Sequence, residues 1–371
     1  MRIVVAPDKF AGTLSAVEAA AAIAEGWRRR APSDDVVTVA MADGGPGFVD
    51  VLHSSLGGTL HAVTVRGPLG APVPATVLLA GGTAYLESAQ ACGLHLLPQH
   101  GGGPAAGAAE SASTYGVGEL VSAAVGAGAT RLVVGLGGSG TNDAGAGMLA
   151  ALGATSQPDG ALTAGPAGLA ELTSVDVEPA RSRLHGVDVV AASDVDNPLL
   201  GLRGATNVYG PQKGIAADRL VEVDGALSVF AHLADRSVAD QPGAGAAGGL
   251  GYGLFLLGAH REPGFATVAE AVGLVAAVAD ADLVLTGEGT LDPQSMSGKV
   301  ASGVAEIAGR AMRPCVAVAG EVEVGLRELR ANGIEAAYSL VELVGRDRAL
   351  GEPAAALADA AERVARTWRR S

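Results

Sequence analysis

The chain alternates short apolar runs with glycine-rich loops and alanine-rich stretches that have helical spacing. The apolar runs have the length of buried strands, and most are followed by a loop and then a helical pattern. This order predicts an α/β protein, because parallel strands need a crossover helix between them. The strands expected from these runs are Met1–Ala6, Val36–Ala40, Leu132–Val134, Val187–Ala192, Ala281–Thr286 and Cys315–Ala319.

Two stretches refine this pattern. Ser15 and Glu18 form a capping-box sequence that predicts a helix reaching about Arg30, and residues 354–369 predict a terminal helix. Between about residues 60 and 90, Val/Thr/Leu runs are broken by Gly-Pro and Ala-Pro, which favours an antiparallel or mixed sheet.

Composition narrows the class of protein. The 371 residues suffice for two domains, and a hydrophobic content of 49% with only 3% aromatic residues favours helix-covered parallel sheets. The formal charge of −14 argues against binding to nucleic acid or to anionic membranes. Cys92 and Cys315 are too few for a disulfide framework, and no apolar run is long enough to span a membrane. We therefore expect a soluble cytoplasmic protein.

The stretch Arg131–Met148 is the most informative part of the chain. A short apolar run leads into a loop containing Gly137, Gly138 and Gly140, and then into Thr141–Asp143, which are good helix N-cap residues. Such a loop exposes backbone N–H groups and predicts a phosphate site. A turn without a ligand is the alternative. A dinucleotide site is disfavoured, because the acidic residue it needs would be Asp159, which lies in a turn sequence.

Charged residues follow several other predicted strands, at the edge where open α/β sheets bind ligands. Asp8 and Lys9 follow the first strand, with a surface ion pair as the alternative. Asp43 follows the second, where an Asx-turn explains it nearly as well. Asp194 begins an Asp-x-Asp-Asn sequence, but Leu199 and Ala205 stand where an EF-hand needs glycine and glutamate, so Mg²⁺ is favoured over calcium.

Three further loops carry candidate chemistry. Lys213 lies in a rigid Tyr-Gly-Pro-Gln-Lys-Gly loop, and Pro242–Gly253 forms a second glycine-rich loop entering a helix. Residues 287–299 end in Gly-Lys, but Pro293 and Val300 replace residues that a P-loop requires. This segment is still a plausible anion-binding helix start.

Together these motifs resemble the bacterial class I glycerate kinases, in the family's order and over essentially the whole chain. The resemblance implies ATP- and Mg²⁺-dependent phosphorylation of D-glycerate, usually to 2-phosphoglycerate. It also implies a Rossmann/flavodoxin-like domain from residues 1–60 and 276–371, with an inserted α/β domain at 61–275. The matching segments are Ala6–Phe10, Leu14–Ala16, Met41–Gly45, Thr114–Leu120, Gly137–Asp143, Asp194–Pro198, Tyr209–Gly214, Pro242–Gly251, Thr286–Asp292 and Gln294–Ser295.

Site roles follow from the resemblance together with loop position. The predicted catalytic residues are Asp8, Lys9, Asp43 and Lys213, and the predicted metal ligands are Asp194 and Asp292, sharing one ion. The expected partner is a small anionic hydroxy acid, and a homodimer is compatible with the sequence. The predicted nucleotide-binding residues are Gly137, Gly138, Ser139, Thr141, Asn142, Gly243, Gly245, Gly248 and Glu288.

Three positions depart from the family pattern. Ala11 stands where lysine is usual, Pro46 lies where a Gly-Glu-Gly sequence is usual, and Thr290 replaces an arginine. Each change removes a charge from a loop expected to face the ligand, and fixed charges are central to phosphoryl transfer. A catalytically weakened paralogue that senses a ligand is therefore the alternative to an active kinase.

Overall fold

The computed structural model describes residues 1–10, 12–293, 295 and 299–369. It divides into two compact units, each with its own sheet. Unit 1 comprises residues 1–43, 50–56 and 265–371, and unit 2 comprises residues 44–49 and 57–264. No helix in the described part of the chain has the length and apolar character needed to cross a membrane.

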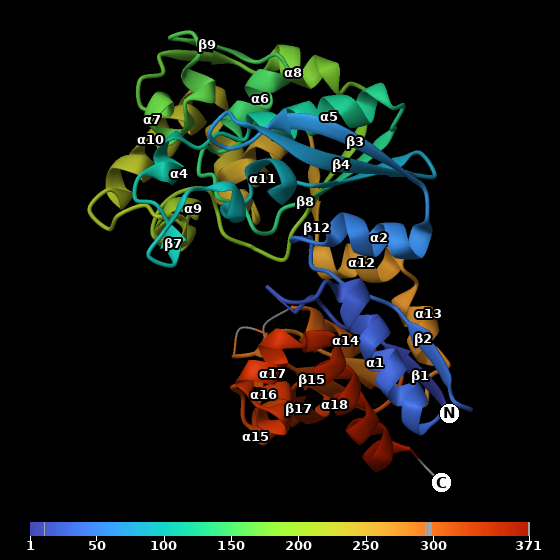
Figure 1. Ribbon diagram of the computed structural model, residues 1–371. Helices are drawn as coiled ribbons and strands as arrows, with labels where there is room; N and C mark the ends of the chain where they lie inside the picture. Colours follow the sequence, from blue (N-terminus) through green and yellow to red (C-terminus); the bar gives the residue numbers. More distant parts are fainter. Residues whose placement is uncertain (11, 294, 296–298, 370–371) are drawn as a thin grey trace. The chain divides into compact units, whose positions relative to one another are not determined.

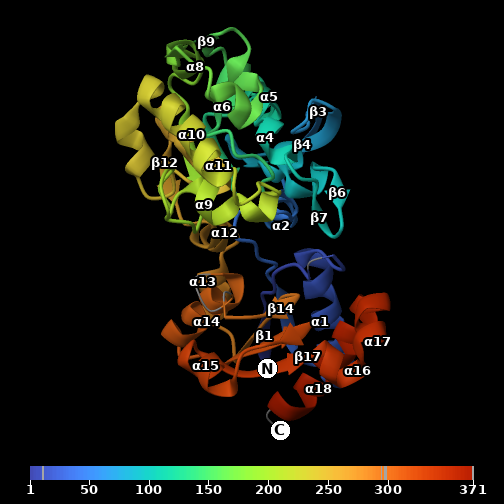
Figure 2. The same ribbon diagram turned by 90° about the vertical axis from the view of Figure 1, so that its left-hand side faces the viewer.

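Unit 1 is built on a parallel sheet shared by the two ends of the chain, with the strand order β17-β15-β13-β1-β2. Figures 1 and 2 show the first and last strands of the chain in this one layer. In chain order this is the flavodoxin-like arrangement 2-1-3-4-5. The α/β fold class predicted from the sequence, including this sheet from both ends of the chain, is confirmed. The strands are β1 (Arg2–Val5), β2 (Asp35–Thr38), β13 (Leu283–Thr286), β15 (Cys315–Ala319) and β17 (Ile334–Ser339), with a small β14 (Thr290–Leu291) and β16 (Glu321–Val322) pair.

The helices of unit 1 cover both faces of this sheet. The chain leaves β1 in one direction towards β2 and in the opposite direction through β13, β15 and β17. Right-handed crossovers therefore put their helices on opposite faces. The helices are α1 (Ala16–Arg30), most of α2 (Phe48–Leu56), α12 (Gly264–Ala271), α13 (Leu274–Ala279), α14 (Val300–Arg310), α15 (Leu326–Ala331), α16 (Leu340–Val344), α17 (Arg346–Gly351) and α18 (Pro353–Trp368).

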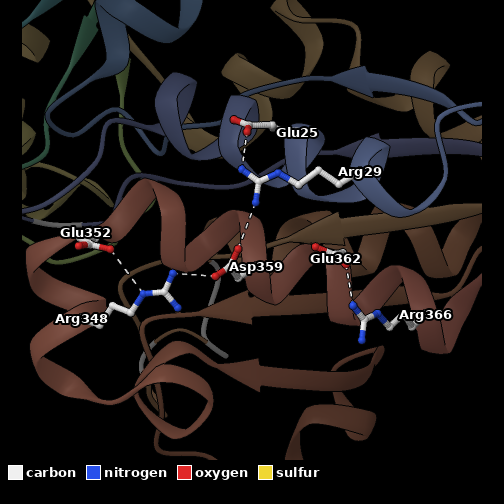
Figure 3. Close-up of polar contacts among 7 residues, drawn as sticks. All are labelled: Glu25, Arg29, Arg348, Glu352, Asp359, Glu362 and Arg366. Atoms are coloured by element: carbon white, nitrogen blue, oxygen red, sulfur yellow. Dashed lines mark hydrogen bonds and ion pairs between the residues drawn. The ribbon is translucent and has the colours of Figure 1, made fainter.

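The first and last helices pack against each other. Helix α1 begins at the predicted capping box, where Ser15 and Glu18 satisfy each other's backbone N–H groups. It runs beside α18, and the Asp359 carboxylate of α18 accepts hydrogen bonds from Arg29 (3.1 Å) and Arg348 (2.7 Å), as Figure 3 shows. These ion pairs join α1, α17 and α18 at the surface of unit 1.

Unit 2 contains a mixed sheet of order β12-β11-β8-β5-β4-β3. Strands β3 to β5 pair antiparallel, as expected for residues 60–90, whereas β5, β8, β11 and β12 are parallel. The strands of this sheet are β3 (Thr59–Arg66), β4 (Pro72–Ala80), β5 (Thr83–Glu87), β8 (Arg131–Gly135), β11 (Asp188–Ala192) and β12 (His260–Glu262).

The rest of unit 2 is mainly helical and covers this sheet. The helices are α3 (Ala89–Cys92), α4 (Ala108–Ser111), α5 (Tyr115–Gly126), α6 (Ala146–Ala151), α7 (Gly165–Leu169), α8 (Glu178–Arg183), α9 (Ala205–Tyr209), α10 (Leu220–Ala234) and α11 (Ala246–Leu256). Unit 2 also contains the short 3₁₀ turns η1 (Leu94–Leu96), η2 (Ala161–Thr163), η3 (Pro211–Lys213) and η4 (Arg236–Asp240). Two further two-stranded sheets pair β6 (Gln99–His100) with β7 (Gly103–Pro104) and β9 (Thr155–Gln157) with β10 (Ser174–Asp176).

Candidate active site

The carboxyl ends of the unit 1 strands open into a cavity of about 400 Å³. The sheet order reverses between β1 and β13, and this switch point is where open α/β sheets bind ligands. Asp8 follows β1 and Glu288 follows β13, so both lie at the switch point. Five predicted site residues line this one cavity, namely Asp8, Lys9, Asp43, Glu288 and Asp292.

The loop after β1 holds a carboxylate and an ammonium side by side. The Asp8 N–H donates to Gly287 O (2.8 Å), which anchors the loop to the chain after β13. Asp8 Oδ1 accepts from the Lys9 N–H (2.7 Å) and lies 3.8 Å from Lys9 Nζ. Burial raises the pKa of Asp8 to about 6, the Lys9 charge opposes this rise, and the Asp43 carboxylate adds to it. Asp8 is thus ionised at neutral pH but close to its titration range.

The loop after β13 supplies two more carboxylates. Glu288 is 9% exposed, and its buried Oε1 has no hydrogen-bond partner among the described residues. Burial raises the pKa of Glu288 to about 7, a hydrogen bond with the Ser295 side chain opposes this rise, and the Asp8 carboxylate adds to it. Asp292 Oδ1 accepts from the Ser295 N–H (2.7 Å) and hydroxyl (3.0 Å), which fixes the carboxylate in the loop. An unsatisfied buried carboxylate oxygen indicates a place for a ligand donor or a cation.

Lys299 also lines this cavity, immediately before α14. The sequence marked it only as part of an anion-binding helix start, and the structure puts its side chain together with Asp8 and Glu288. Lys9 and Lys299 are thus the two lysines among the cavity-lining residues.

In unit 2 the glycine loop after β8 is organised differently from the sequence prediction. Thr141–Asp143 do not cap the following helix: α6 begins at Ala146, and its N-cap is Gly145 in the left-handed region. Asp143 instead accepts from Thr114 N–H (2.8 Å), Thr114 Oγ1 (2.9 Å), Gly145 N–H (3.1 Å) and Gly147 N–H (3.2 Å). The predicted N-cap position was wrong, since Gly145 occupies it. The buried Asp143 carboxylate still accepts from Gly147 N–H in the first turn of α6, and it also ties this loop to Thr114 at the start of α5.

Lys213 is buried against the same loop. Its Nζ donates to Ser139 Oγ (2.9 Å) and to Thr141 O (2.7 Å), and the residue is only 2% exposed. Burial lowers the pKa of Lys213 to about 8, and the Asp143 carboxylate is among the groups that oppose this shift. Lys213 therefore reaches the loop that contains the predicted phosphate-binding groups, and holds Ser139 and Thr141 in place.

The second glycine-rich stretch packs onto the first. Gly248 has φ +69°, and a Cβ there would lie 1.9 Å from Thr141 O and 2.8 Å from Lys213 Nζ. Gly245 N–H donates to Asn197 O (2.8 Å), which joins this stretch to the loop after β11. The structure thus brings Ser139, Thr141, Lys213 and Gly248 together, with Gly137, Gly138 and Asn142 in the same loop as Ser139.

Both aspartates after β11 are exposed, and Asp194 is the one nearer the carboxyl end of the strand. Asp196 pairs with Arg261 (2.7 Å), whose Nε donates to Ser193 O (3.0 Å). Gly243 lies next to Arg261 and Val195, at the base of this loop. Asp194 belongs to unit 2 and Asp292 to unit 1, so their sharing of one ion stays a prediction.

The three departures from the family pattern fall in different places. Thr290 is exposed and lines the unit 1 cavity, and Pro46 lies beside Gly138 in unit 2. Ala11, Gln294 and residues 296–298 lie outside the described residues. Thr290 is therefore the departure that changes the described lining of the cavity.

Comparison with known proteins gives a consistent result. The family model described as Glycerate kinase family matches residues 3–369. An uncharacterised protein of Mycobacterium bovis is 44% identical over 98% of this chain and 89% of its own length. The glycerate kinase of Bacillus subtilis is 43% identical over 92% of this chain and 90% of its own length.

A solved structure agrees with these relatives. A crystal structure from Salmonella typhimurium LT2, assigned as glycerate kinase 2, superimposes with a TM-score of 0.81 at 38% identity. The match covers 99% of this chain and 98% of that chain. These matches confirm the resemblance inferred from the motifs. The chain belongs to the glycerate kinase family.

Proposed function

We propose that this protein transfers the γ-phosphoryl group of ATP to a hydroxyl of D-glycerate, or of a close small hydroxy acid, giving 2-phosphoglycerate from glycerate. Membership of a kinase family implies ATP as the co-substrate. The observation that carries the proposal is the Asp8–Lys9 pair in the cavity at the switch point of the unit 1 sheet. A phosphoryl-transfer site needs a carboxylate for the attacking hydroxyl and fixed cations for the phosphate oxygens.

In this proposal Asp8 orients the acceptor hydroxyl and takes its proton. The acceptor oxygen bonds to the γ-phosphorus, the bond to the β-phosphate oxygen breaks, and ADP leaves. With a pKa of about 6, Asp8 is ionised at pH 7 to 8 and is basic enough to accept the proton. Lys9 and Lys299 would neutralise the substrate carboxylate and the phosphate oxygens.

A magnesium ion fits the chemistry of the donors in the cavity. No group of three or more His, Cys, Asp or Glu side chains in the described chain could hold a metal alone. Mg²⁺ does not need such a group, since it commonly binds one or two carboxylates together with substrate phosphates. Asp292 is our proposed ligand in unit 1, and the orphaned Glu288 Oε1 is a further oxygen donor there. Asp194 stays a predicted ligand. When bound, the ion would neutralise charge on the phosphates.

The glycine loops of unit 2 are the proposed second anion-binding element. Ser139, Thr141 and Asn142 are fixed by Lys213 and by Thr206, whose hydroxyl accepts from Asn142 Nδ2 (2.9 Å). Lys213 then acts as a positioning residue, because both of its bonds go to the loop. We also propose a cytoplasmic location, where ATP is available and the buried thiols of Cys92 and Cys315 stay reduced.

The test is an ADP-release assay with purified protein, ATP and a panel of small hydroxy acids. We expect D-glycerate or a close hydroxy acid to give turnover that depends on Mg²⁺. ATP binding without ADP release for any acid would contradict the proposal and favour a ligand sensor.

Substitutions of two aspartates in the loop after β11 test the proposed metal ligand in the same assay. Asp194→Asn should abolish turnover with little change in melting temperature, if Asp194 holds the metal. Asp196→Asn is the matched control, because Asp196 is another exposed carboxylate of the same loop that is not a proposed metal ligand, and it should retain turnover. Equal activities of the two variants would remove Asp194 from the proposed metal site.

A further inference from the structure

The lining of the unit 1 cavity changes from charged to apolar across the sheet. At the β1 and β13 end the lining is mostly charged, with Asp8, Lys9, Glu288 and Asp292, and Phe10 is an apolar residue among them. The segments that follow β17 supply a second group, called here the apolar wall: Leu340, Val341, Ala349, Leu350 and Pro353. The proposed acceptor, a three-carbon acid, has no apolar portion that could occupy this wall.

The strand order fixes the sequence of these surfaces in space. From the β17 loop to the β2 loop there are four inter-strand spacings, roughly 19 Å. Apolar side chains come first, Glu321 after β15 comes next, and the lysine and carboxylate groups after β13 and β1 follow. A cavity of about 400 Å³ is in the range of sites that bury ligands much larger than glycerate.

We infer that the apolar wall binds the purine nucleoside of the nucleotide, so that its phosphates extend towards Lys299 and Lys9. This inference rests on the proposed kinase function and adds where the nucleoside binds. A purine is flat and largely apolar on its faces, which suits aliphatic side chains, whereas a triphosphate needs cations and a hard metal at its other end. The chemical order of the nucleotide matches the order of the cavity.

Glu321 has the position and chemistry to bind the ribose. It lies between the apolar wall and the charged end, and Arg346 pairs with its Oε1 (2.6 Å). An ionised carboxylate only accepts hydrogen bonds, so it can accept from ribose hydroxyl groups. Glu321 lines the cavity as well as pairing with Arg346, so its carboxylate is the group that we assign to the ribose.

The test compares ligands that contain the nucleoside with one that lacks it. Leu350 is 57% exposed, so Leu350→Glu should fold normally while placing a charge in the apolar wall. Isothermal titration should show at least tenfold weaker binding of ATP and ADP, because a carboxylate must be desolvated against the base. Binding of inorganic triphosphate should change less than twofold, since it occupies only the charged end.

Two further variants keep the test decisive. Leu326→Glu changes an equally exposed leucine (51%) that is not among the residues lining the cavity, and it should leave ATP binding unchanged. Val341→Ala, a milder change in the apolar wall, should weaken ATP binding without affecting inorganic triphosphate.

The outcomes separate this inference from the proposed function. If ADP release from glycerate is intact but Leu350→Glu and Val341→Ala bind ATP like the parent protein, the nucleoside lies elsewhere and the inference is overturned. Equal weakening of ATP and inorganic triphosphate would also overturn it. If ATP affinity is kept and KM rises only for hydroxy acids with apolar tails, the wall binds the acceptor instead. Binding is measured without turnover, so the inference can hold even if no acid is phosphorylated.

Discussion

Glu288 is a single residue of the proposed site that lowers the free energy of unfolding of the protein. Its carboxyl group is buried, its Oε1 has no partner in the described structure, and its pKa is raised from 4.5 to about 7. Between these two pH values the folded chain keeps a proton that the unfolded chain releases. The native state then binds more protons, so the free energy of unfolding falls as pH rises through this window.

We therefore predict that Glu288→Gln stabilises the protein above pH 7. Glutamine stays neutral, so it avoids the desolvation of a buried carboxylate, and the gain should be about 2–3 kcal/mol at pH 8. The gain should shrink towards zero below pH 4.5, where Glu288 is protonated in both states. Thermal unfolding of parent and variant from pH 4 to pH 8 measures this, with the exposed Glu171→Gln as control. A constant difference at all pH values would contradict the assigned cause.

The sequence identified some of these residues and missed others for physical reasons. Asp8, Lys9 and Asp43 could be predicted because parallel strands end at a common edge, so residues that follow them converge. Lys299 was predicted only as part of an anion-binding helix start, since its Gly-Lys sequence does not complete a P-loop and so gave its side chain no role. Asp143 was interpreted as a helix cap, because its partner Thr114 is 29 residues away and a long-range hydrogen bond leaves no local pattern.

At the scale of elements, α1 and α18 approach closely at a glycine. A Cβ at Gly26 would lie 1.9 Å from Ala358 O, so the two helices could not keep their present separation with a larger residue. Around this contact the helices bury alanines such as Ala19 and Ala361, which are small enough for close packing. The ion pairs of Asp359 in Figure 3 lie at the edge of this interface and are partly exposed. Exposed ion pairs contribute little to stability. The close approach at Gly26 is therefore the main constraint on the spacing of α1 and α18.

We predict that Gly26→Ala destabilises unit 1 by about 1–3 kcal/mol, as overpacked cores typically do. Gly309→Ala is the matched control: Gly309 lies in α14, and a Cβ there would meet nothing within 4 Å. The free energy of unfolding of this control should rise by about 0.5–1 kcal/mol, because alanine has a higher helix propensity than glycine. Thermal unfolding by calorimetry distinguishes the two. Equal effects of both substitutions would mean that the α1–α18 spacing can relax.

Helix and strand boundaries were predictable where local signals agree with the packing. The capping box of α1 and the strand Cys315–Ala319 are confirmed as expected from the sequence. In unit 2 the glycine stretch 242–253 was expected to enter a helix, but Ala247, Gly248 and Gly249 have left-handed backbone inside α11. At the interruption Gly248 packs so closely on Thr141 O that a side chain would not fit, a tertiary contact that sequence periodicity does not contain.

At the scale of the whole molecule, the division into two units predicts that unit 2 can fold without unit 1. Unit 1 needs both ends of the chain, because β1 pairs with β13 and β2 is at the sheet edge. Unit 2 is continuous from residue 57 to 264 except for the short segment 44–49. That segment contributes the Gly47 N–H bond to Glu87 (2.9 Å), the Gly44 carbonyl that accepts from Gly137 (3.0 Å), and the edge-to-face contact of Phe48 with Tyr85.

We predict that the fragment 57–264 folds alone and that 44–264 is more stable. The two hydrogen bonds and the aromatic contact should together add about 2–3 kcal/mol, or roughly 5–10 °C in melting temperature for a unit of this size. Phe48→Ala in the longer fragment should remove about half of this gain. Circular dichroism melts of the three proteins measure these differences.

The same experiment tests the domain boundaries predicted from the sequence. A fragment 61–275 lacks Thr59 and Leu60, which pair with Leu79 and Leu78. It also carries α12 without the rest of unit 1, leaving Val268, which is fully buried in the structure, exposed to water. We expect 61–275 to melt below 57–264 and to aggregate more readily, because an exposed apolar helix face promotes association. If 61–275 is instead the more stable fragment, α12 belongs to the inserted domain and the sequence-based boundaries are correct. If no fragment unfolds cooperatively, the inserted segment depends on the terminal one and the two units are not independent domains.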